Sequence, residues 1–271
     1  MAEISVIMGV RCGTEKKPLL ERSVRSVLSQ THVDFEFLIC DDGSSREIME
    51  LLEDYSAHDS RIKLLRRCDR LTLAQKLNYC LAHAGGRYVA RMDDDDYSLP
   101  QRFEKQVEYL SEHEDIAFVG CNTDVLSCGK KIGEYVFPEQ PSARDFRFTQ
   151  PFIHSAIMFR IEALNEVGGY SENTNCILCE DYELLMRMYA KGFCGANIEE
   201  RLLEYTVAPD LKTNRTLRHR WNECVTRFHS FRKNGLLPLY SVYVIKPLAV
   251  CLVPSKLLCA IKKKRIKKYD P

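Results

Sequence analysis

Short apolar runs alternate with amphipathic segments along the first part of the chain. The runs at residues 4–10 and 34–40 are rich in Ile, Val, Phe and Leu, as expected for strands covered on both faces. Between them, residues 18–30 carry apolar side chains at helical spacing. The alternation continues with helices and strands expected, in chain order, at residues 48–58, 61–67, 72–84 and 87–92. This order predicts an α/β fold with a doubly wound, mostly parallel sheet of the Rossmann-like type.

Capping residues indicate where two of the helices begin. Thr72 and Gln75 have the spacing of a capping box, in which each side chain bonds the backbone N–H of the other residue. Ser98 and Gln101 have the same spacing, and Pro100 between them suits the first turn of a helix. We therefore expect one helix to follow Thr72 and another to follow Ser98.

Composition narrows the class of protein without identifying it. With 271 residues, of which 45% are hydrophobic and 28% charged, the chain has the make-up of an ordinary globular protein. The net charge of +1 gives no global argument for a nucleic-acid partner. Twelve cysteines are scattered at irregular intervals, and Glu3 lies where a secretory signal would carry basic residues. We therefore expect reduced thiols in a cytoplasmic protein.

Acidic residues follow two of the expected strands. Asp41 and Asp42 follow the second strand, and four consecutive aspartates, Asp93 to Asp96, follow the fourth. In a doubly wound sheet, ligands bind beyond the carboxyl ends of the strands, so both clusters fall where a ligand site is expected. Neighbouring carboxylates repel one another, and a divalent cation shared with a diphosphate would offset that repulsion. The alternative is that each cluster is a solvated acidic turn.

The last quarter of the chain differs in character from the rest. Residues 218–232 form a basic helix pattern that carries aromatic side chains, and the apolar segment after it is interrupted by lysines and prolines. No uncharged run there is long enough to span a bilayer, and six basic residues follow at 262–268. We divide the chain into a first domain, residues 1–210, and a helical extension, residues 211–271. The extension is expected to lie on an anionic membrane surface, with packing onto the first domain as the alternative.

Five segments together resemble the large family-2 group of GT-A glycosyltransferases. They read SVRSVLSQTHVDFEFLICDDGSS, LNYCLAHAGGRYVARMDDDDYSLPQRFEKQ, HSAIMFR, VGGY and EDYELLMRM. The resemblance covers roughly residues 3 to 207, and the segments follow one another in the order found in that family. It implies a GT-A fold for the first domain and the transfer of a sugar from a nucleotide-sugar donor.

The same resemblance implies roles for the two acidic clusters. In that family an aspartate of the DDG turn recognises the nucleotide base, which corresponds here to Asp42, with Asp41 as its neighbour. The acidic element after the fourth strand holds the nucleotide sugar and a metal ion. Asp95 would then be the main ligand of Mn²⁺ or Mg²⁺, and Asp93 and Asp94 would face the ribose and the diphosphate.

A later acidic pair would supply the catalytic base. The family's "ED" element corresponds to Glu180 and Asp181, and its base corresponds to Asp181. Independently of the resemblance, a carboxylate aimed at a sugar hydroxyl can take its proton as the new C–O bond forms. The simpler interpretation is an acidic residue in the first turn of a helix. The implied reaction is a single in-line displacement with inversion, in which the metal stabilises the departing diphosphate.

The expected nucleotide, the number of sugars added and the location follow from departures from the family pattern and from the basic tail. The first strand is followed by MGVRCGT in place of the family's usual base-binding turn, so UDP is expected only because it is the commonest carrier in such relatives. A Q-x-x-R-W segment and long transmembrane helices, both marks of processive synthases, are missing. We therefore expect a non-processive enzyme that adds one sugar to a glycan or lipid-linked acceptor in polysaccharide biosynthesis. It would be peripheral on the inner face of the cell membrane, without a nucleic-acid partner.

Two other functions and several weaker signals stay open. A nucleotidyltransferase would also use strand-end aspartates with Mg²⁺, and a non-catalytic nucleotide- or carbohydrate-binding protein would keep the same fold. The Cys176–Cys179 pair is a lone C-x-x-C motif, for which zinc is a minor alternative. His154 is either a satisfied strand-end histidine or a contact in the site. Asn78 is a weak candidate for a donor contact, and Gly168–Gly169 most simply forms a turn.

Overall fold

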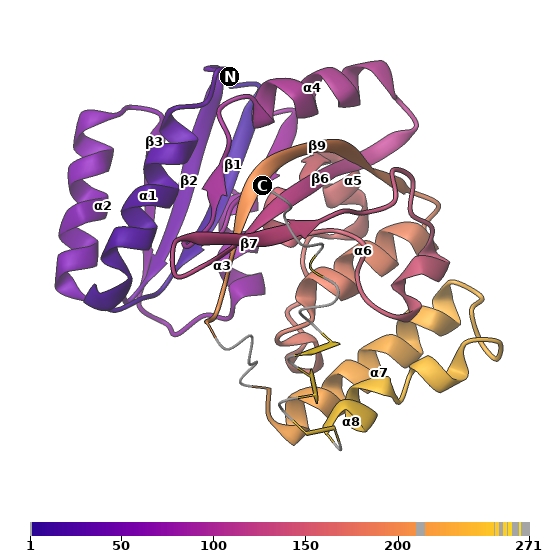
Figure 1. Ribbon diagram of the computed structural model, residues 1–271. Coiled ribbons are helices and arrows are strands. Elements are labelled where there is room, and N and C mark those ends of the chain that lie inside the picture. Colours follow the sequence, from indigo (N-terminus) through magenta and orange to yellow (C-terminus); the bar gives the residue numbers. More distant parts are fainter. Residues whose placement is uncertain are drawn as a thin grey trace.

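The computed structural model describes residues 2–209 and 215–251, and beyond these residues 253–254, 257–258, 260–261 and 266. Its centre is a mixed sheet of nine strands with helices on both faces (Figure 1). The strands follow the order β3-β2-β1-β4-β8-β6-β9-β5, and β7 pairs with β6. Their bounds are β1 Ile4–Val10, β2 Phe35–Asp42, β3 Ile62–Arg67, β4 Tyr88–Arg91, β5 Tyr97–Ser98, β6 Ile116–Ser127, β7 Lys130–Tyr135, β8 Met158–Arg160 and β9 Cys194–Val207.

The first four strands form the predicted parallel part of the sheet. β1 pairs in parallel with β2 and β4, and β2 pairs in parallel with β3. Helices α1 and α2 cover one face and α3 covers the other; they span Lys17–Leu28, Arg46–His58 and Leu73–Leu81. Since side chains alternate along a strand, Val6 packs in the cluster that contains Leu20 of α1, whereas Ile7 packs in the cluster that contains Leu77 of α3. Burial on both faces accounts for the continuous apolar run of β1.

Beyond β4 the sheet becomes mixed. β8 runs antiparallel to both β4 and β6, whereas β6 and β9 are parallel to each other. The two-residue strand β5 pairs with β9 in antiparallel orientation. The parallel order predicted from the alternation of strands and helices therefore holds for the first four strands, and the second half adds antiparallel pairs. Of the segment HSAIMFR, only Met158–Arg160 forms a strand, because His154–Ala156 forms a short 3₁₀ helix.

The two predicted helix starts have different outcomes. The capping box at Thr72 is confirmed, with both of its hydrogen bonds present. The predicted cap at Ser98 is wrong, because Ser98 belongs to β5 and its Oγ accepts a hydrogen bond from Nε2 of Gln30 at 3.1 Å. Helix α4, Arg102–Glu112, instead begins after Gln101 and has no side-chain cap.

Helices of the second half of the chain pack beside the sheet and continue into the C-terminal part (Figure 1). They are α5 Ile161–Val167, α6 Glu180–Ala190, α7 Leu217–Lys233 and α8 Lys246–Cys251. The helix predicted at residues 218–232 is confirmed as α7. Phe231 of α7 is buried in the same cluster as Leu185 of α6, so this helix shares a core with the sheet. The boundary at residue 210 remains a prediction.

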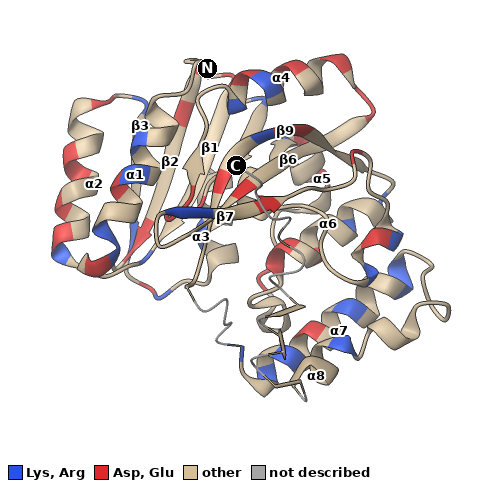
Figure 2. Cartoon of the chain, in the orientation of Figure 1, with Lys and Arg blue, Asp and Glu red and all other residues tan. Residues whose placement is uncertain are grey.

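The C-terminal segment that was expected to lie on a membrane is only partly described. No helix within the described residues is long and apolar enough to cross a membrane. The six basic residues within 262–268 lie outside the described residues. Ile266 is described, and it is buried in a small cluster with Val125 of β6. Figure 2 shows acidic and basic residues spread over the helices, in keeping with the net charge of +1.

Candidate active site

The two acidic clusters lie at the same edge of the sheet. β2 and β4 flank β1 on either side, and all three strands run in the same direction, so their carboxyl ends lie together. The buried thiol of Cys12, just beyond β1, lies close enough to sense both clusters. Its pKa is raised to about 11 by burial and by the charges of Asp94 and Asp41. The structure thus brings together the two groups that the sequence suggested for one ligand site.

Asp42 is held by the backbone of the loop after β3. Its carboxylate accepts hydrogen bonds from the N–H groups of Asp69 at 3.0 Å, Arg70 at 3.1 Å and Leu71 at 2.5 Å. Both oxygens of Asp42 are therefore occupied by main-chain donors. Oδ1 of Asp41, in contrast, is buried without a hydrogen-bond partner. Of the two aspartates, Asp41 is therefore the one with an oxygen that has no hydrogen-bond partner.

Two lysines that were not predicted as site residues lie close to the acidic clusters. Lys76 of α3 is buried, and burial lowers the pKa of its amine while nearby Asp94 and Asp42 oppose that change. The pKa of Lys16 is raised, chiefly by Asp94. Gly9 of β1 makes room for Lys76, since a Cβ atom at Gly9 would lie 3.1 Å from Cβ of the lysine. A lysine inside the apolar stripe of a helix was the sequence signal for this site.

Two of the four consecutive aspartates have structural partners for their carboxylates. Asp96 is fully buried, and its carboxylate accepts hydrogen bonds from Oγ of Ser155 and from the N–H of Thr206, the latter at 2.7 Å. It therefore ties the end of β4 to β9 and to the 3₁₀ helix that contains Ser155. Asp93 forms an ion pair with the buried Arg91. The carboxylates of Asp94 and Asp95 have no such partners among the hydrogen bonds and ion pairs of the described residues, and only the backbone C=O of Asp95 accepts a bond, from Oγ1 of Thr206 at 2.6 Å.

Asp94 and Asp95 have raised pKa values, as expected of carboxylates that bind a cation. The pKa of Asp95 is raised to about 6 by burial and by the charges of Asp93 and Asp94. Burial likewise raises the pKa of Asp94, while Lys16 opposes that change. A divalent cation would offset these costs, and carboxylate oxygens are the ligands that Mg²⁺ and Mn²⁺ prefer. No group of three ligating side chains within the described residues forms a complete metal site, so substrate oxygens would have to complete the shell.

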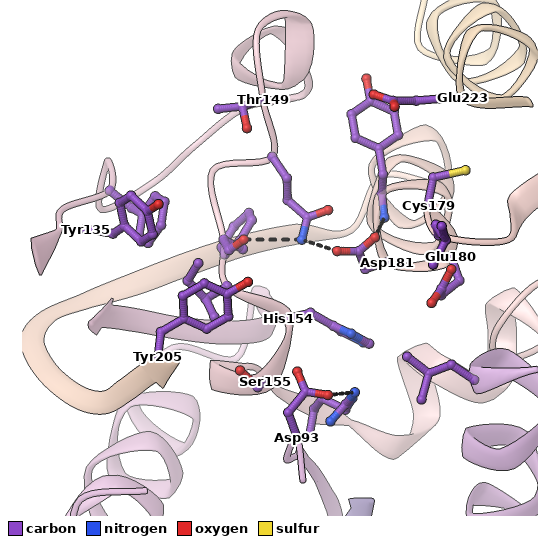
Figure 3. Close-up of a pocket in the computed structure, with 18 of the residues that line it drawn as sticks. Asp93, Tyr135, Thr149, His154, Ser155, Cys179, Glu180, Asp181, Tyr205 and Glu223 are labelled. Carbon is purple, nitrogen blue, oxygen red and sulfur yellow. Dashed lines mark hydrogen bonds and ion pairs between the residues drawn. The ribbon is translucent and has the colours of Figure 1, made fainter. Parts of the chain in front are cut away.

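A cavity of about 450 Å³ extends from the end of β4 to the start of α6 (Figure 3). Its walls include Arg91, Asp93, His154, Glu180 and Asp181. In Figure 3, Glu180 and Asp181 lie on the α6 side, across from Asp93 and His154. The predicted base therefore lies in the same cavity as one of the aspartates that follow β4.

Asp181 is oriented by two hydrogen bonds. Its Oδ2 accepts a bond from Nε2 of Gln150 at 3.0 Å, and its Oδ1 accepts one from the N–H of Tyr182 at 2.8 Å. Burial raises the pKa of Asp181, and these bonds together with the charge of Arg215 oppose the rise. Gln150, which comes from a loop far away in the sequence, was not identified as a site residue. The arrangement fixes a carboxylate at the cavity wall, as a general base requires.

Glu180 has a different environment from its neighbour. It is 9% exposed, and its Oε2 is buried without a hydrogen-bond partner. Burial and the charge of Asp181 raise the pKa of Glu180 to about 7.

Some weaker candidates have structural roles. Nε2 of His154 lies 2.8 Å from Oη of Tyr170, and burial together with Arg91 lowers the pKa of His154 well below its usual value. The histidine is thus a neutral, hydrogen-bonded residue in the cavity wall. The amide of Asn78 bonds both the C=O and the N–H of Tyr170, at 2.9 and 2.8 Å. It thereby holds the predicted turn at Gly168–Gly169, whose φ angles are 78° and 66°.

The cysteines within the described residues are free thiols, and Cys176 and Cys179 belong to no metal cluster there. Sγ of Cys179 instead lies 3.6 Å from Oγ1 of Thr226.

Comparison with known proteins identifies relatives across most of the chain. The family model of glycosyl transferase family 2 matches residues 5–168, and that of glycosyl transferase family group 2 matches residues 88–261. The glycosyltransferase EpsE of Bacillus subtilis (strain 168) is 32% identical over 97% of this chain and 94% of that protein. The O-antigen biosynthesis glycosyltransferase WbnJ of Escherichia coli is 32% identical over 75% of this chain and 79% of its own length.

Solved structures show the same fold at lower sequence identity. The crystal structure of Staphylococcus aureus TarS 1-349 in complex with UDP has a TM-score of 0.65 and 16% identity, covering 86% of this chain and 70% of that one. The mannosyltransferase PcManGT from Pyrobaculum calidifontis in complex with GDP-Man and Mn²⁺ has a TM-score of 0.61 and 16% identity, covering 96% and 79%.

Proposed function

Because the chain belongs to glycosyl transferase family 2 and has a GT-A fold, we propose that it transfers a sugar from a nucleoside diphosphate sugar to a hydroxyl group of a glycan or lipid-linked acceptor. The observation that carries this proposal is the arrangement of the cavity. Acidic residues at the end of β2 and shortly after β4 lie at one edge of the sheet, and Asp181 faces the same cavity as Asp93. No observation favours the nucleotidyltransferase or the non-catalytic binding protein over a glycosyltransferase.

The nucleotide would bind over the carboxyl ends of β1, β2 and β4. We assign the base contact to Asp42 with Asp41, and contacts to the ribose and diphosphate to Asp93 and Asp94. The unpartnered Oδ1 of Asp41 supports a ligand on this side. UDP is the proposed carrier, supported by the UDP in the similar TarS structure. The GDP-Man in PcManGT makes GDP-sugars the comparison in any binding test.

The proposed metal is Mn²⁺ or Mg²⁺, with Asp95 as its main protein ligand. The raised pKa of Asp95 supports this assignment, because it reports a carboxylate that lacks a compensating cation. When bound, such an ion supplies charge stabilisation to the leaving diphosphate. Lys16 and Lys76, whose charges both act on Asp94, would contribute further positive charge near the diphosphate.

Asp181 is proposed as the general base. Gln150 and the N-terminal backbone of α6 hold its carboxylate in place, and the acceptor hydroxyl would give its proton to this carboxylate as the bond to the anomeric carbon forms. With the diphosphate leaving from the opposite side, the reaction is a single displacement with inversion. One sugar is added in each encounter.

We place this reaction in polysaccharide biosynthesis at the inner face of a bacterial membrane. The name of the WbnJ relative, which refers to O-antigen biosynthesis, supports the first part. Support for a peripheral location comes from exposed apolar side chains on and after α7: Trp221 is 60% exposed, Leu239 78% and Val242 64%. Such side chains suit the headgroup region of a bilayer. The burial of Ile266 against Val125 supports the alternative, in which the tail packs on the domain.

A donor screen followed by a transfer assay tests the proposal. The purified chain with Mn²⁺ is screened by thermal shift against UDP-glucose, UDP-N-acetylglucosamine, GDP-mannose and the free diphosphates. The donor that binds is then incubated with bacterial lipid-linked glycans, and release of the nucleoside diphosphate is measured. Release that depends on the glycans supports a glycosyltransferase. A chain that binds none of these nucleotides contradicts the proposal.

A further inference from the structure

Glu180 lies where two cavities meet. It lines the main cavity of about 450 Å³ and also a second cavity of about 110 Å³. Leu73 of α3 and Leu178 line both cavities as well, so the Glu180 carboxyl lies among apolar side chains at the junction. A carboxyl group in such a position is expected only where something polar binds beside it.

The Glu180 carboxyl is only partly satisfied, because backbone hydrogen bonds from Leu178 and Glu180 favour its charged form but burial outweighs them. Its Oε2 is buried without a partner, and the residue belongs to no ion pair within the described part of the chain. The charged and titratable groups that act on it are Asp181 on the same helix and Arg91 from β4, with Tyr170 from the loop after α5 also near it. Asp181 disfavours a second negative charge, Arg91 favours one, and burial dominates, which gives the pKa of about 7.

The two acidic neighbours are therefore suited to different tasks. Both oxygens of Asp181 accept hydrogen bonds, from Gln150 and from the backbone of Tyr182, which favours the charged form. Glu180 has no such donor at Oε2 and holds its proton at higher pH. Paired carboxyl groups whose environments differ in this way commonly divide the acid and base roles between them.

The position of Glu180 fits the transferred sugar. In an in-line displacement the anomeric carbon lies between the acceptor oxygen, beside Asp181, and the diphosphate, beside Asp94 and Asp95. Glu180 shares its cavities with Leu73 of α3, and α3 also carries Lys76, which lies close to Asp94. Glu180 is thus on the nucleotide side of Asp181, next to the space that the sugar ring has to occupy.

We propose that Glu180 binds the transferred sugar, donating a hydrogen bond from its carboxyl group to a sugar hydroxyl oxygen. The inference rests on the proposed function and extends it to the class of donor. A hydroxyl-bearing, uncharged sugar fits this end of the cavity, because Asp181 next to Glu180 would repel a sugar carboxylate. The arginines of the cavity wall already form ion pairs with Asp93 or Glu223; they are Arg91, Arg215 and Arg227. The small second cavity leaves room for a substituent beside the ring.

The test compares binding of the sugar nucleotide with binding of the free diphosphate. Wild type, Glu180→Gln and Glu180→Ala are titrated calorimetrically with UDP-glucose or UDP-N-acetylglucosamine, and with UDP, in the presence of Mn²⁺ at pH 6.5. Glutamine keeps a neutral hydrogen-bond donor, whereas alanine removes it. We expect Glu180→Ala to bind the sugar nucleotide about 3- to 10-fold more weakly, the size of one hydrogen bond, with unchanged affinity for UDP. Glu180→Gln should stay within about twofold of wild type.

Several results would overturn the inference. Wild-type affinity of Glu180→Ala for the sugar nucleotide would show that the contact is not made, and an equal loss of UDP affinity would indicate a structural role. Equal losses in the glutamine and alanine variants would mean that the negative charge is required. Asp181→Asn is the matched control and should keep the sugar preference. If wild type itself prefers no sugar nucleotide from the UDP and GDP series over the free diphosphate, the proposed donor class fails before the role of Glu180 is tested.

A pH series tests whether the protonated Glu180 carboxyl donates a hydrogen bond or only contacts the sugar. As pH rises from 6 to 9, wild type should lose its preference for the sugar nucleotide over UDP, while Glu180→Gln should keep it. Measuring the ratio of the two affinities cancels the effect of pH on the metal and on the diphosphate. A ratio that falls equally in both proteins would contradict the inference.

Discussion

Arg91 and Asp93 form an ion pair in which the guanidinium is 1% exposed and the carboxylate 33% exposed. The pair lies at the point where β4 ends and the acidic run begins. Nε and Nη1 of Arg91 are buried without a partner, so Asp93 is the group that compensates its charge. The first aspartate of the run therefore serves the folded protein as well as the proposed donor site.

Asp93→Asn and Asp95→Asn should consequently have opposite effects on the metal-free protein. Removing the charge of Asp93 leaves the buried Arg91 uncompensated, and we expect a loss of about 2 kcal/mol or more in the free energy of unfolding. Asp95→Asn removes a repelling carboxylate, so stability should stay the same or rise. Urea denaturation in EDTA measures both changes. Equal destabilisation by the two variants would contradict the division of roles within the run.

The metal prediction concerns Asp95→Asn in the presence of nucleotide. The variant should keep its fold but lose the part of the nucleotide affinity that depends on Mn²⁺, because the main protein ligand is gone. Titration with UDP, with and without Mn²⁺, measures that part. Glu199→Gln serves as the control, because it also removes a carboxylate but at an exposed position of β9. Wild-type metal dependence in Asp95→Asn would show that the ligand lies elsewhere.

Glu180 should make stability depend on pH. Its pKa is raised to about 7 in the folded protein, so the folded state holds a proton that the unfolded state releases above its ordinary pKa of 4.5. The contribution is present below about pH 4.5 and is lost as pH rises through 7, on the order of 3 kcal/mol in total. The difference in unfolding free energy between Glu180→Gln and wild type should therefore grow over this range. A difference independent of pH would contradict the buried, unpaired carboxyl.

The proposed membrane association should depend on the basic residues within 262–268. Replacing the six basic residues within 262–268 by glutamine should abolish the salt-sensitive part of binding to anionic vesicles, since each contributes about 1 kcal/mol near such a surface. Exposed apolar residues such as Leu239 should leave a weaker, salt-resistant part. Cosedimentation with anionic and neutral vesicles measures both parts. Substitution is preferable to truncation at Gly235, because Leu236 is buried in the core cluster of α6 and α7. Equal vesicle binding by the two proteins would support packing of the tail on the domain.

Features that depend on local sequence were predicted well. The four parallel strands, α1 to α3 and the cap at Thr72 each follow from periodicity or from residues three positions apart. The convergence of Asp41–Asp42 with Asp93–Asp96 follows from one topological rule, that parallel strands end at one edge.

Features that depend on distant partners were missed or predicted wrongly. Ser98 has the local signature of a cap, but pairing of β5 with β9 places it in a strand. Asp96 looks like its three neighbours in the sequence, yet Ser155 and Thr206 bury it in a structural role. Lys76 stands out only as a lysine in the apolar stripe of its helix, and its place beside the acidic clusters depends on the packing of α3 against β1. Such roles are set by tertiary contacts and leave little trace in the local pattern.

The most direct test of the account measures transfer and donor binding in the same pair of proteins, wild type and Asp181→Asn. With the donor and acceptor that support transfer by wild type, Asp181→Asn should lose about 10²-fold or more in kcat, the size expected for a general base. Its affinity for the sugar nucleotide with Mn²⁺ should remain that of wild type, because the proposed role of Asp181 is toward the acceptor and not the donor. Comparable turnover in the two proteins would contradict the assignment of Asp181 as the base.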